Sequence, residues 1–241
     1  VVNLVYGAKE FNQIRIDNGR VTIGASVTIT EVKDSDELNQ LLPGLGNYLN
    51  LMASTPIRNM ATVGGNIANG SPIGDVSVML MGLDATLVLS NKGIKREVKL
   101  RDFFVGYKKV AKDAEELVEC VYFDKPNEST RFSFEKISKR IHLDMATVNS
   151  SMRVVLEEGV IQKASFAVGG LGPTIRYLDK TADYLVGKKI DNATFKEANH
   201  IAQTEITPRS RAEYKRALVR QQLLIHLMSF SPETVTLEAL Q

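Results

Sequence analysis

Hydrophobic and polar residues alternate near the N-terminus in a pattern that predicts an antiparallel strand pair. Four aliphatic residues take every second position on either side of Asn18-Gly19: Ile14, Ile16, Val21 and Ile23. An Asn-Gly pair between two alternating runs is a strong signal of a tight hairpin. Apolar residues at helical spacing come next. They predict a short helix over 28–35 and a second helix over 45–53, which ends before Pro56. We therefore expect a hairpin followed by short helices.

The same patterns divide the rest of the chain into strands followed by helices. Strands are predicted on both sides of a linker at 125–129, over the segments 85–89, 94–98, 117–123, 132–137, 145–156 and 161–168. A short helix is predicted over 100–105, and three further helices begin at Thr181, Asn192 and Ser210. Strands followed by helices are typical of an α+β fold. We therefore expect an α+β protein with one domain over 1–126 and a second over 130–241.

Composition and charge exclude several classes of function. The 241 residues include 30 basic and 28 acidic ones, which are spread along the chain and give a net charge of +2. This distribution does not predict a basic surface that would bind a polyanion. Apolar runs stay short of the roughly 18 residues that a membrane span needs. We expect a cytoplasmic protein that binds neither nucleic acid nor membranes. A lone Cys120 supports no cysteine-ligated iron–sulfur cluster, and the three histidines lack the spacing of a metal site. Redox chemistry would therefore require an organic cofactor.

The segment 61–75 has an unusual composition. It holds four glycines within eleven residues: Gly64, Gly65, Gly70 and Gly74. Glycine in a fixed conformation costs roughly 0.5–1 kcal/mol more than alanine, so such a cluster indicates that the backbone approaches something closely. We predict a loop that opens into a helix with Asp75 as its N-cap, and its amides would suit a pyrophosphate or a polyol. Because the P-loop and GxGxxG patterns are absent, a ligand loop and a glycine-rich connector remain equally open.

Longer motifs in this segment resemble a known family. Thr62-Val63-Gly64-Gly65-Asn66-Ile67, followed by Ser71-Pro72-Ile73-Gly74-Asp75, is similar to the second flavin-binding motif of the FAD subunit or domain in the molybdenum hydroxylases. This family includes the xanthine dehydrogenase FAD-binding subunit and the carbon monoxide dehydrogenase medium subunit. Similar motifs occur at 54–59, 102–107, 169–174 and 210–216, so the resemblance covers almost the whole chain.

The resemblance implies a fold and a set of cofactor-binding residues. The fold would be an FAD-binding domain of the PCMH type, mainly its second subdomain, followed by a C-terminal α+β flavoprotein domain. By position in the motifs, ten residues would line the FAD: Thr62, Gly64, Gly65, Asn66, Ser71 and Asp75 beside the phosphates and the ribityl chain, Met52 and Ala53 on the adenine side, and Val118 and Lys136 near the isoalloxazine ring. A cation at Lys136 would favour the anionic reduced flavin and so raise its potential. No side chain is assigned a catalytic role or a metal.

The family also implies a function and partners. The chain would be an electron-transfer subunit that takes electrons from a 2Fe-2S small subunit and passes them through FAD to NAD+ or another acceptor. Hydroxylation would take place on a molybdopterin-binding large subunit. Two alternatives remain open. One is a self-sufficient FAD-dependent oxidoreductase of the related flavin fold, and the other is a non-catalytic scaffold subunit that has lost FAD.

Two departures from the family pattern bear on these alternatives. The family carries a first glycine-rich motif of the form Val-x-Gly-Gly-Thr-Asp before the position that matches Val1, and that motif has no counterpart here. Either an N-terminal piece is missing, or the chain binds FAD poorly by itself. We expect the first, because Val1–Leu4 resembles a strand already in progress. In addition, Met52 replaces an aromatic residue that stacks on adenine in some relatives.

Overall fold

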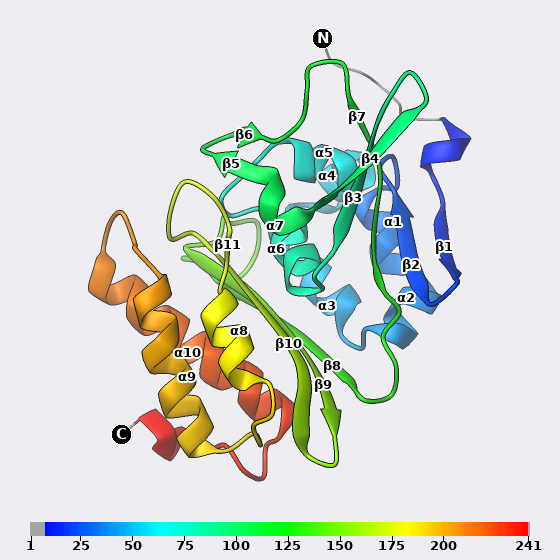
Figure 1. Ribbon diagram of the computed structural model, residues 1–241. Coiled ribbons are helices and arrows are strands. Elements are labelled where there is room, and N and C mark those ends of the chain that lie inside the picture. The colour runs from blue at the N-terminus through cyan, green and yellow to red at the C-terminus, as the bar shows by residue number, and fades with distance from the viewer. Residues whose placement is uncertain (1–7, 241) are drawn as a thin grey trace.

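The structure is a computed structural model that describes residues 8–240 (Figure 1). The strand expected at Val1–Leu4 lies outside these residues. The first half contains an antiparallel five-stranded sheet whose strands are, in spatial order, β1 (Ile14–Asp17), β2 (Arg20–Gly24), β7 (Leu117–Asp124), β3 (Thr86–Asn91) and β4 (Ile94–Lys99). The hairpin predicted around Asn18-Gly19 is confirmed, and the strands predicted over 85–89 and 94–98 form a second hairpin. Their turns place Asn18-Gly19 and Lys92-Gly93 at positive φ, which is the geometry that a two-residue hairpin turn requires.

Short helices cover this sheet: α1 (Ile29–Asp34), α2 (Asp36–Leu41), α3 (Leu45–Asn50), α4 (Thr55–Met60), α5 (Val63–Ala68), α6 (Asp75–Gly82) and α7 (Leu100–Phe103). Helix α1 begins as predicted, because Thr28 and Glu31 form a reciprocal capping box. The sequence did not predict α2 and α4. Pro56 does follow the end of α3, but it also occupies the first turn of α4, where its missing N–H is not needed.

The structure corrects the prediction for 61–75. Residues 63–68 of the expected loop form helix α5, and Thr62 caps this helix by accepting a hydrogen bond from the Gly65 amide at 3.1 Å. A Cβ at Gly64 would lie 2.6 Å from the Cβ of Ala25, so this glycine permits close packing of α5 on the end of β2. Asp75 is the first residue of α6 and Gly74 is its N-cap, so the prediction that Asp75 caps this helix was wrong. The reason is that the Asp75 carboxylate bonds to the second half of the chain.

The second half contains a four-stranded antiparallel sheet in the order β11 (Arg176–Tyr177), β10 (Val160–Gly169), β9 (Val148–Glu157) and β8 (Thr130–Ile137). One face is covered by α8 (Asp179–Leu185), α9 (Asn192–Glu205) and α10 (Ala212–Phe230), as Figure 1 shows. The predicted strands and helices of this half are therefore present. Two short strands, β5 (Phe104–Gly106) and β6 (Lys109–Val110), form a separate hairpin, so the helix expected over 100–105 ends at Phe103. Single 3-10 turns lie at Lys9–Phe11 and Leu237–Leu240.

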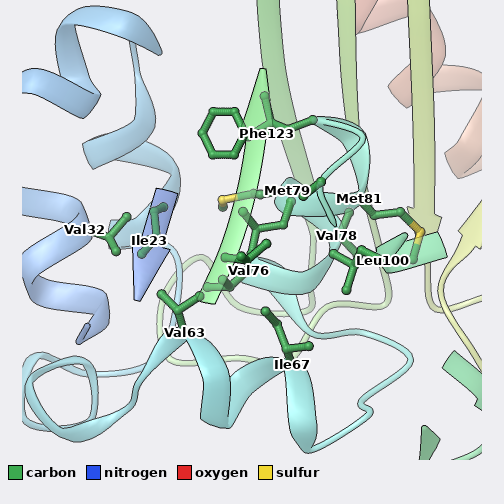
Figure 2. Packing of buried hydrophobic residues seen from close by; sticks show 14 of the residues in the cluster. Ile23, Val32, Val63, Ile67, Val76, Val78, Met79, Met81, Leu100 and Phe123 are labelled. Carbon is green, nitrogen blue, oxygen red and sulfur yellow. The ribbon is translucent and has the colours of Figure 1, made fainter. Parts of the chain in front are cut away.

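Helix α6 lies between the two sheets. All eight of its residues are buried, which is typical of a helix that is packed on every side. Figure 2 shows Val76, Val78 and Met79 of α6 among side chains from α5 and β7. On its other side, the hydroxyls of Ser151 in β9 and Ser165 in β10 donate to the carbonyls of Val78 and Gly82, both at 2.5 Å. The two halves therefore pack directly on one shared helix.

Candidate functional site

A cleft of about 470 Å³ opens where the two halves meet. One wall is formed by residues 52–54, which precede α4, and by Ile57 within α4. A second wall comes from the α5–α6 segment, from residues between 66 and 75. The third comes from the second half, from Lys136 and residues 143–146. The volume lies within the roughly 300–1,000 Å³ typical of ligand pockets. Six of the ten residues assigned by resemblance line this cleft: Met52, Ala53, Asn66, Ser71, Asp75 and Lys136.

A buried arginine that the sequence did not single out fixes one wall of the cleft. Arg58 in α4 is only 7% exposed, and its guanidinium donates to the carbonyls of Met52 at 2.7 Å and Ala53 at 2.8 Å. It also donates to the hydroxyl of Thr55 at 2.9 Å. Ala53 has a φ of 46°, a left-handed conformation that is uncommon for alanine. Arg58 therefore holds a strained turn in place.

The α5–α6 segment supplies neutral polar groups. The side-chain oxygen of Asn66 accepts from the Ser77 amide at 3.3 Å and from its hydroxyl at 3.0 Å. These two bonds fix the orientation of the amide, and its NH₂ group has no hydrogen-bond partner among residues 8–240. The Ser71 hydroxyl accepts from the Ile73 amide at 3.3 Å and can still donate its proton. Asn66 and Ser71 therefore offer donors to an electronegative ligand.

An ion pair joins the two halves beneath the cleft. The ammonium of Lys136 in β8 donates to one Asp75 oxygen at 2.6 Å and to the Leu51 carbonyl at 2.9 Å. The Asn149 amide in β9 donates to the other Asp75 oxygen at 2.7 Å. The side chains of Lys136 and Asp75 are 4% and 9% exposed. Burial raises the pKa of the Asp75 carboxyl above its ordinary value, while Lys136 and Asn149 act in the opposite direction.

The remaining assigned residues lie outside the cleft lining. Thr62 caps α5, Gly64 is buried against Ala25, and Gly65 is exposed in the first turn of the same helix. Val118 lies on β7 opposite Leu89 and packs against the first core. The glycines and Thr62 therefore shape α5, which presents Asn66.

The rim of the cleft is apolar. Ile57, Leu143 and Met145 line it and are 55%, 60% and 76% exposed. Asp144, between the last two, accepts from the backbone amide of Arg140 at 3.0 Å, and this bond helps to shape the β8–β9 loop. No role was predicted for this loop from the sequence, because nothing in its local pattern indicates that it returns to the α5–α6 segment. An apolar rim around a polar floor is the usual design of a pocket for an organic ligand.

Neither a membrane span nor a metal centre is found in the part of the chain that the structure describes. No helix within 8–240 combines the length and the apolar character needed to cross a bilayer. In the same residues, no three His, Cys, Asp or Glu side chains are grouped so that they could hold a metal ion.

Comparison with known proteins identifies the family. Residues 4–125 match the model for the FAD binding domain in molybdopterin dehydrogenase, and residues 133–228 match that for the CO dehydrogenase flavoprotein C-terminal domain. The nicotinate dehydrogenase FAD-subunit of Eubacterium barkeri is 29% identical over 208 residues, which are 85% of this chain and 70% of that protein. Xanthine dehydrogenase 1 of Arabidopsis thaliana is 27% identical over 231 residues, but the match spans only 17% of that protein.

The fold is likewise similar to that of a solved structure. A chain of the Cu,Mo-CO dehydrogenase superposes with a TM-score of 0.83 at 27% identity, over 89% of this chain and 76% of that one. The resemblance seen in the glycine-rich motifs is therefore confirmed along nearly the whole chain, and FAD is the cofactor of the matching domain. This chain belongs to the family of FAD-binding domains of molybdopterin dehydrogenases, and it continues into the flavoprotein C-terminal domain of that family.

Proposed function

We propose that this chain is the FAD-binding electron-transfer subunit of a molybdenum hydroxylase. In this proposal, electrons arrive from a 2Fe-2S small subunit and leave through FAD to NAD+ or another acceptor, while a molybdopterin-binding large subunit hydroxylates the substrate. The observation that carries the proposal is the cleft, which brings together six residues assigned from separate flavin motifs. A cytoplasmic location, and the division into domains at 1–126 and 130–241, belong to the same proposal.

The residues of the cleft fit an extended flavin nucleotide. The unpartnered NH₂ of Asn66 and the Ser71 hydroxyl can donate to phosphate or ribityl oxygens. Gly65 is exposed in the first turn of α5, so a ligand can approach the backbone closely there. Met52 and Ala53 offer apolar contact on the proposed adenine side. We propose that these residues, with Thr62, Gly64, Asp75, Val118 and Lys136, form the FAD site.

The side chains of this chain would hold and tune the cofactor. FAD, when bound, supplies the redox chemistry and exchanges electrons with both one-electron and two-electron partners. Lys136 places its ammonium at the cleft wall, where a positive charge favours a negative charge on a nearby ligand. Asp75 neutralises much of that charge and fixes its position. The pair therefore sets both where the cation lies and how strongly it acts.

The direct test is the visible absorption spectrum of the purified chain with and without added FAD, together with a version that carries any natural residues upstream of Val1. Protein-bound flavin absorbs at about 450 nm, independently of the substrate. We expect the extended chain to be yellow and the 241-residue chain to bind FAD more weakly. A colourless extended chain that does not take up FAD would support the scaffold alternative. Substrate turnover by the yellow chain without partners would support the self-sufficient oxidoreductase.

Arg58 gives a second prediction for this site. Replacing Arg58 with methionine removes the donors that hold the Met52 and Ala53 carbonyls, so the turn can leave its left-handed conformation. We expect FAD to bind at least about tenfold more weakly, or ~1.4 kcal/mol, with a flavin potential close to that of the wild type. Flavin fluorescence titration and spectroelectrochemistry measure the two quantities.

The Arg58 prediction has a matched control. Arg58→Lys keeps one donor group and is expected to recover part of the affinity. Arg131→Met changes an exposed arginine on β8, away from the cleft lining, and should leave affinity unchanged. Unaltered FAD affinity in folded Arg58→Met would show that the turn does not depend on this arginine.

A further inference from the structure

Arg153 is a buried cation that has no hydrogen-bond or ion-pair partner among residues 8–240. It lies on β9, on the face of the sheet shared by Asn149 and Ser151, which both bond to the α6 segment. The residue is 9% exposed, and its fully buried Nε has no hydrogen-bond partner among the described residues. None of the ion pairs found within 8–240 includes its guanidinium. The Nε of Arg58 is likewise buried without a bond, but the terminal nitrogens of Arg58 make three hydrogen bonds.

The Nε of Arg153 is fully buried without a hydrogen bond, and leaving this part of a charged group unbonded is energetically unfavourable. An arginine guanidinium remains protonated in proteins, so burial cannot be relieved by loss of the proton. An unpaired buried charge costs several kcal/mol, which is why buried charges are nearly always paired or hydrogen-bonded. The surroundings of Arg153 should therefore contain a group that neutralises it.

Those surroundings form a second cavity, separate from the cleft. This cavity, here called the Arg153 cavity, has a volume of about 220 Å³ and lies between β9, β10 and the segment that joins β7 to β8. Lys125 and Lys163 line it together with Arg153 and contribute two more positive charges. Asp124 and Glu157 also line it, but neither forms an ion pair with Arg153 within the described structure. The lining therefore carries three positive and two negative side chains.

A local irregularity of the sheet brings further donors to the same cavity. The register between β9 and β10 shifts between Ile161 and Lys163, which leaves Gln162 as the extra residue of a bulge. Adjacent residues of a regular strand point to opposite faces, whereas a bulge re-aims one of them. Gln162 and Lys163 accordingly both line the Arg153 cavity. The bulge thus adds an amide and an ammonium to the guanidinium.

We propose that the Arg153 cavity binds a small free oxyanion of the size and charge of inorganic phosphate. The flat guanidinium matches two oxygens of such an ion at once, and the two lysines add charge without demanding a fixed geometry. The cavity is smaller than the roughly 300 Å³ at which organic ligand pockets begin, so it favours an inorganic ion over a nucleotide. The bound ion would tie residues 124–130 to the β9–β10 sheet and so brace the junction of the two halves.

The test compares phosphate with chloride at matched ionic strength, using the full chain with its FAD as purified. We expect phosphate to raise the Tm saturably in the wild type, and isothermal titration to give one site. Arg153→Met should weaken phosphate binding at least about tenfold, and Arg153→Lys should restore only part of it because the two-oxygen contact is lost. Lys196→Met, an exposed change on α9 outside the cavity lining, should leave phosphate binding unchanged.

Two further variants keep the test decisive if Arg153→Met does not fold. Lys163→Gln removes a positive charge and should weaken phosphate binding, whereas Glu157→Gln removes a repelling carboxylate and should strengthen it. The proposal is overturned if the wild type responds equally to phosphate and chloride. It is also overturned if a folded Arg153→Met or Lys163→Gln variant binds phosphate as tightly as the wild type, because the ion would then not be held by the charges of this cavity.

Discussion

Replacement of Lys136 by methionine is expected to destabilise the protein by about 3–5 kcal/mol, which is the usual effect of removing one partner from a buried ion pair. The lysine joins Asp75 of α6 to β8 and also holds the Leu51 carbonyl, so its loss leaves a buried carboxylate without a counter-charge. In the same variant we expect weaker FAD binding and a more negative flavin potential, because in the proposed site the Lys136 cation lies near the flavin ring and favours its anionic reduced form. Chemical denaturation and spectroelectrochemistry measure these effects.

A double-mutant cycle separates the ion pair from simple packing. In the double variant Lys136→Met/Asp75→Asn, neither side chain of the pair is charged, so most of the stability lost in Lys136→Met should return. The flavin potential should remain as negative as in Lys136→Met, because the cation is still absent. Lys139→Met changes an exposed lysine three residues further along and should alter stability by less than about 0.5 kcal/mol. If the double variant is as unstable as the sum of both single variants, the two side chains do not act as a pair.

The elements that the sequence predicted well are those encoded locally. Each hairpin has its own turn residues, and Asn18-Gly19 and Lys92-Gly93 adopt the positive φ that such turns need. Helix α1 likewise carries its own start signal in Thr28 and Glu31. These features depend on four or five consecutive residues. They are therefore readable before any tertiary contact is known.

The errors occur where tertiary packing outweighs local preference. Gly64 and Gly65 favour a loop by their intrinsic propensity, yet they lie in α5, which Thr62 caps and which packs so closely on Ala25 that a Cβ at Gly64 has no room. Asp75 has the residue type of an N-cap, yet its carboxylate is taken by Lys136 and Asn149. Those partners lie 61 and 74 positions away in the chain, so no spacing rule could have found them.

The resemblance to a family supplied what spacing could not, with one limit. It selected Asn66, Asp75 and Lys136 from distant motifs, and all three line one cleft. It assigned no role to Arg58, although this arginine lies in the motif at 54–59, because Arg58 bonds to the carbonyls and hydroxyl of the cleft wall. Assigning ligand contacts from motifs therefore leaves out the residues that hold those contacts in place.

His226 gives the second large effect expected, in the core of the C-terminal half. It is fully buried in α10, between the hydroxyls of Ser133 at 2.5 Å from Nδ1 and Ser150 at 2.8 Å from Nε2. Its ring also packs edge-on against Phe166. Replacing it with alanine leaves a cavity and two buried hydroxyls without this partner, so we expect a loss of about 3–5 kcal/mol in the free energy of unfolding.

The same histidine predicts how stability depends on pH. Burial lowers the pKa of His226 from 6.5 to about 3, so the folded protein keeps the ring neutral where the unfolded chain would protonate it. The unfolded state therefore binds more protons below pH 6.5, and acid favours unfolding. This contribution should reduce the free energy of unfolding by about 1.4 kcal/mol per pH unit between the two pKa values and should vanish above 6.5.

The variant His226→Phe tests this origin, because phenylalanine fills the ring volume and does not titrate. At pH 7 it should be less stable than the wild type, since Ser133 and Ser150 lose a hydrogen-bond partner. The difference in the free energy of unfolding between the two proteins should narrow as the pH falls. The reason is that acid destabilises the wild type through its buried imidazole, which the variant lacks. His200→Gln changes an exposed histidine of α9 and should keep the wild-type pH profile. A constant difference between His226→Phe and the wild type from pH 7 to pH 4 would show that another group controls acid unfolding.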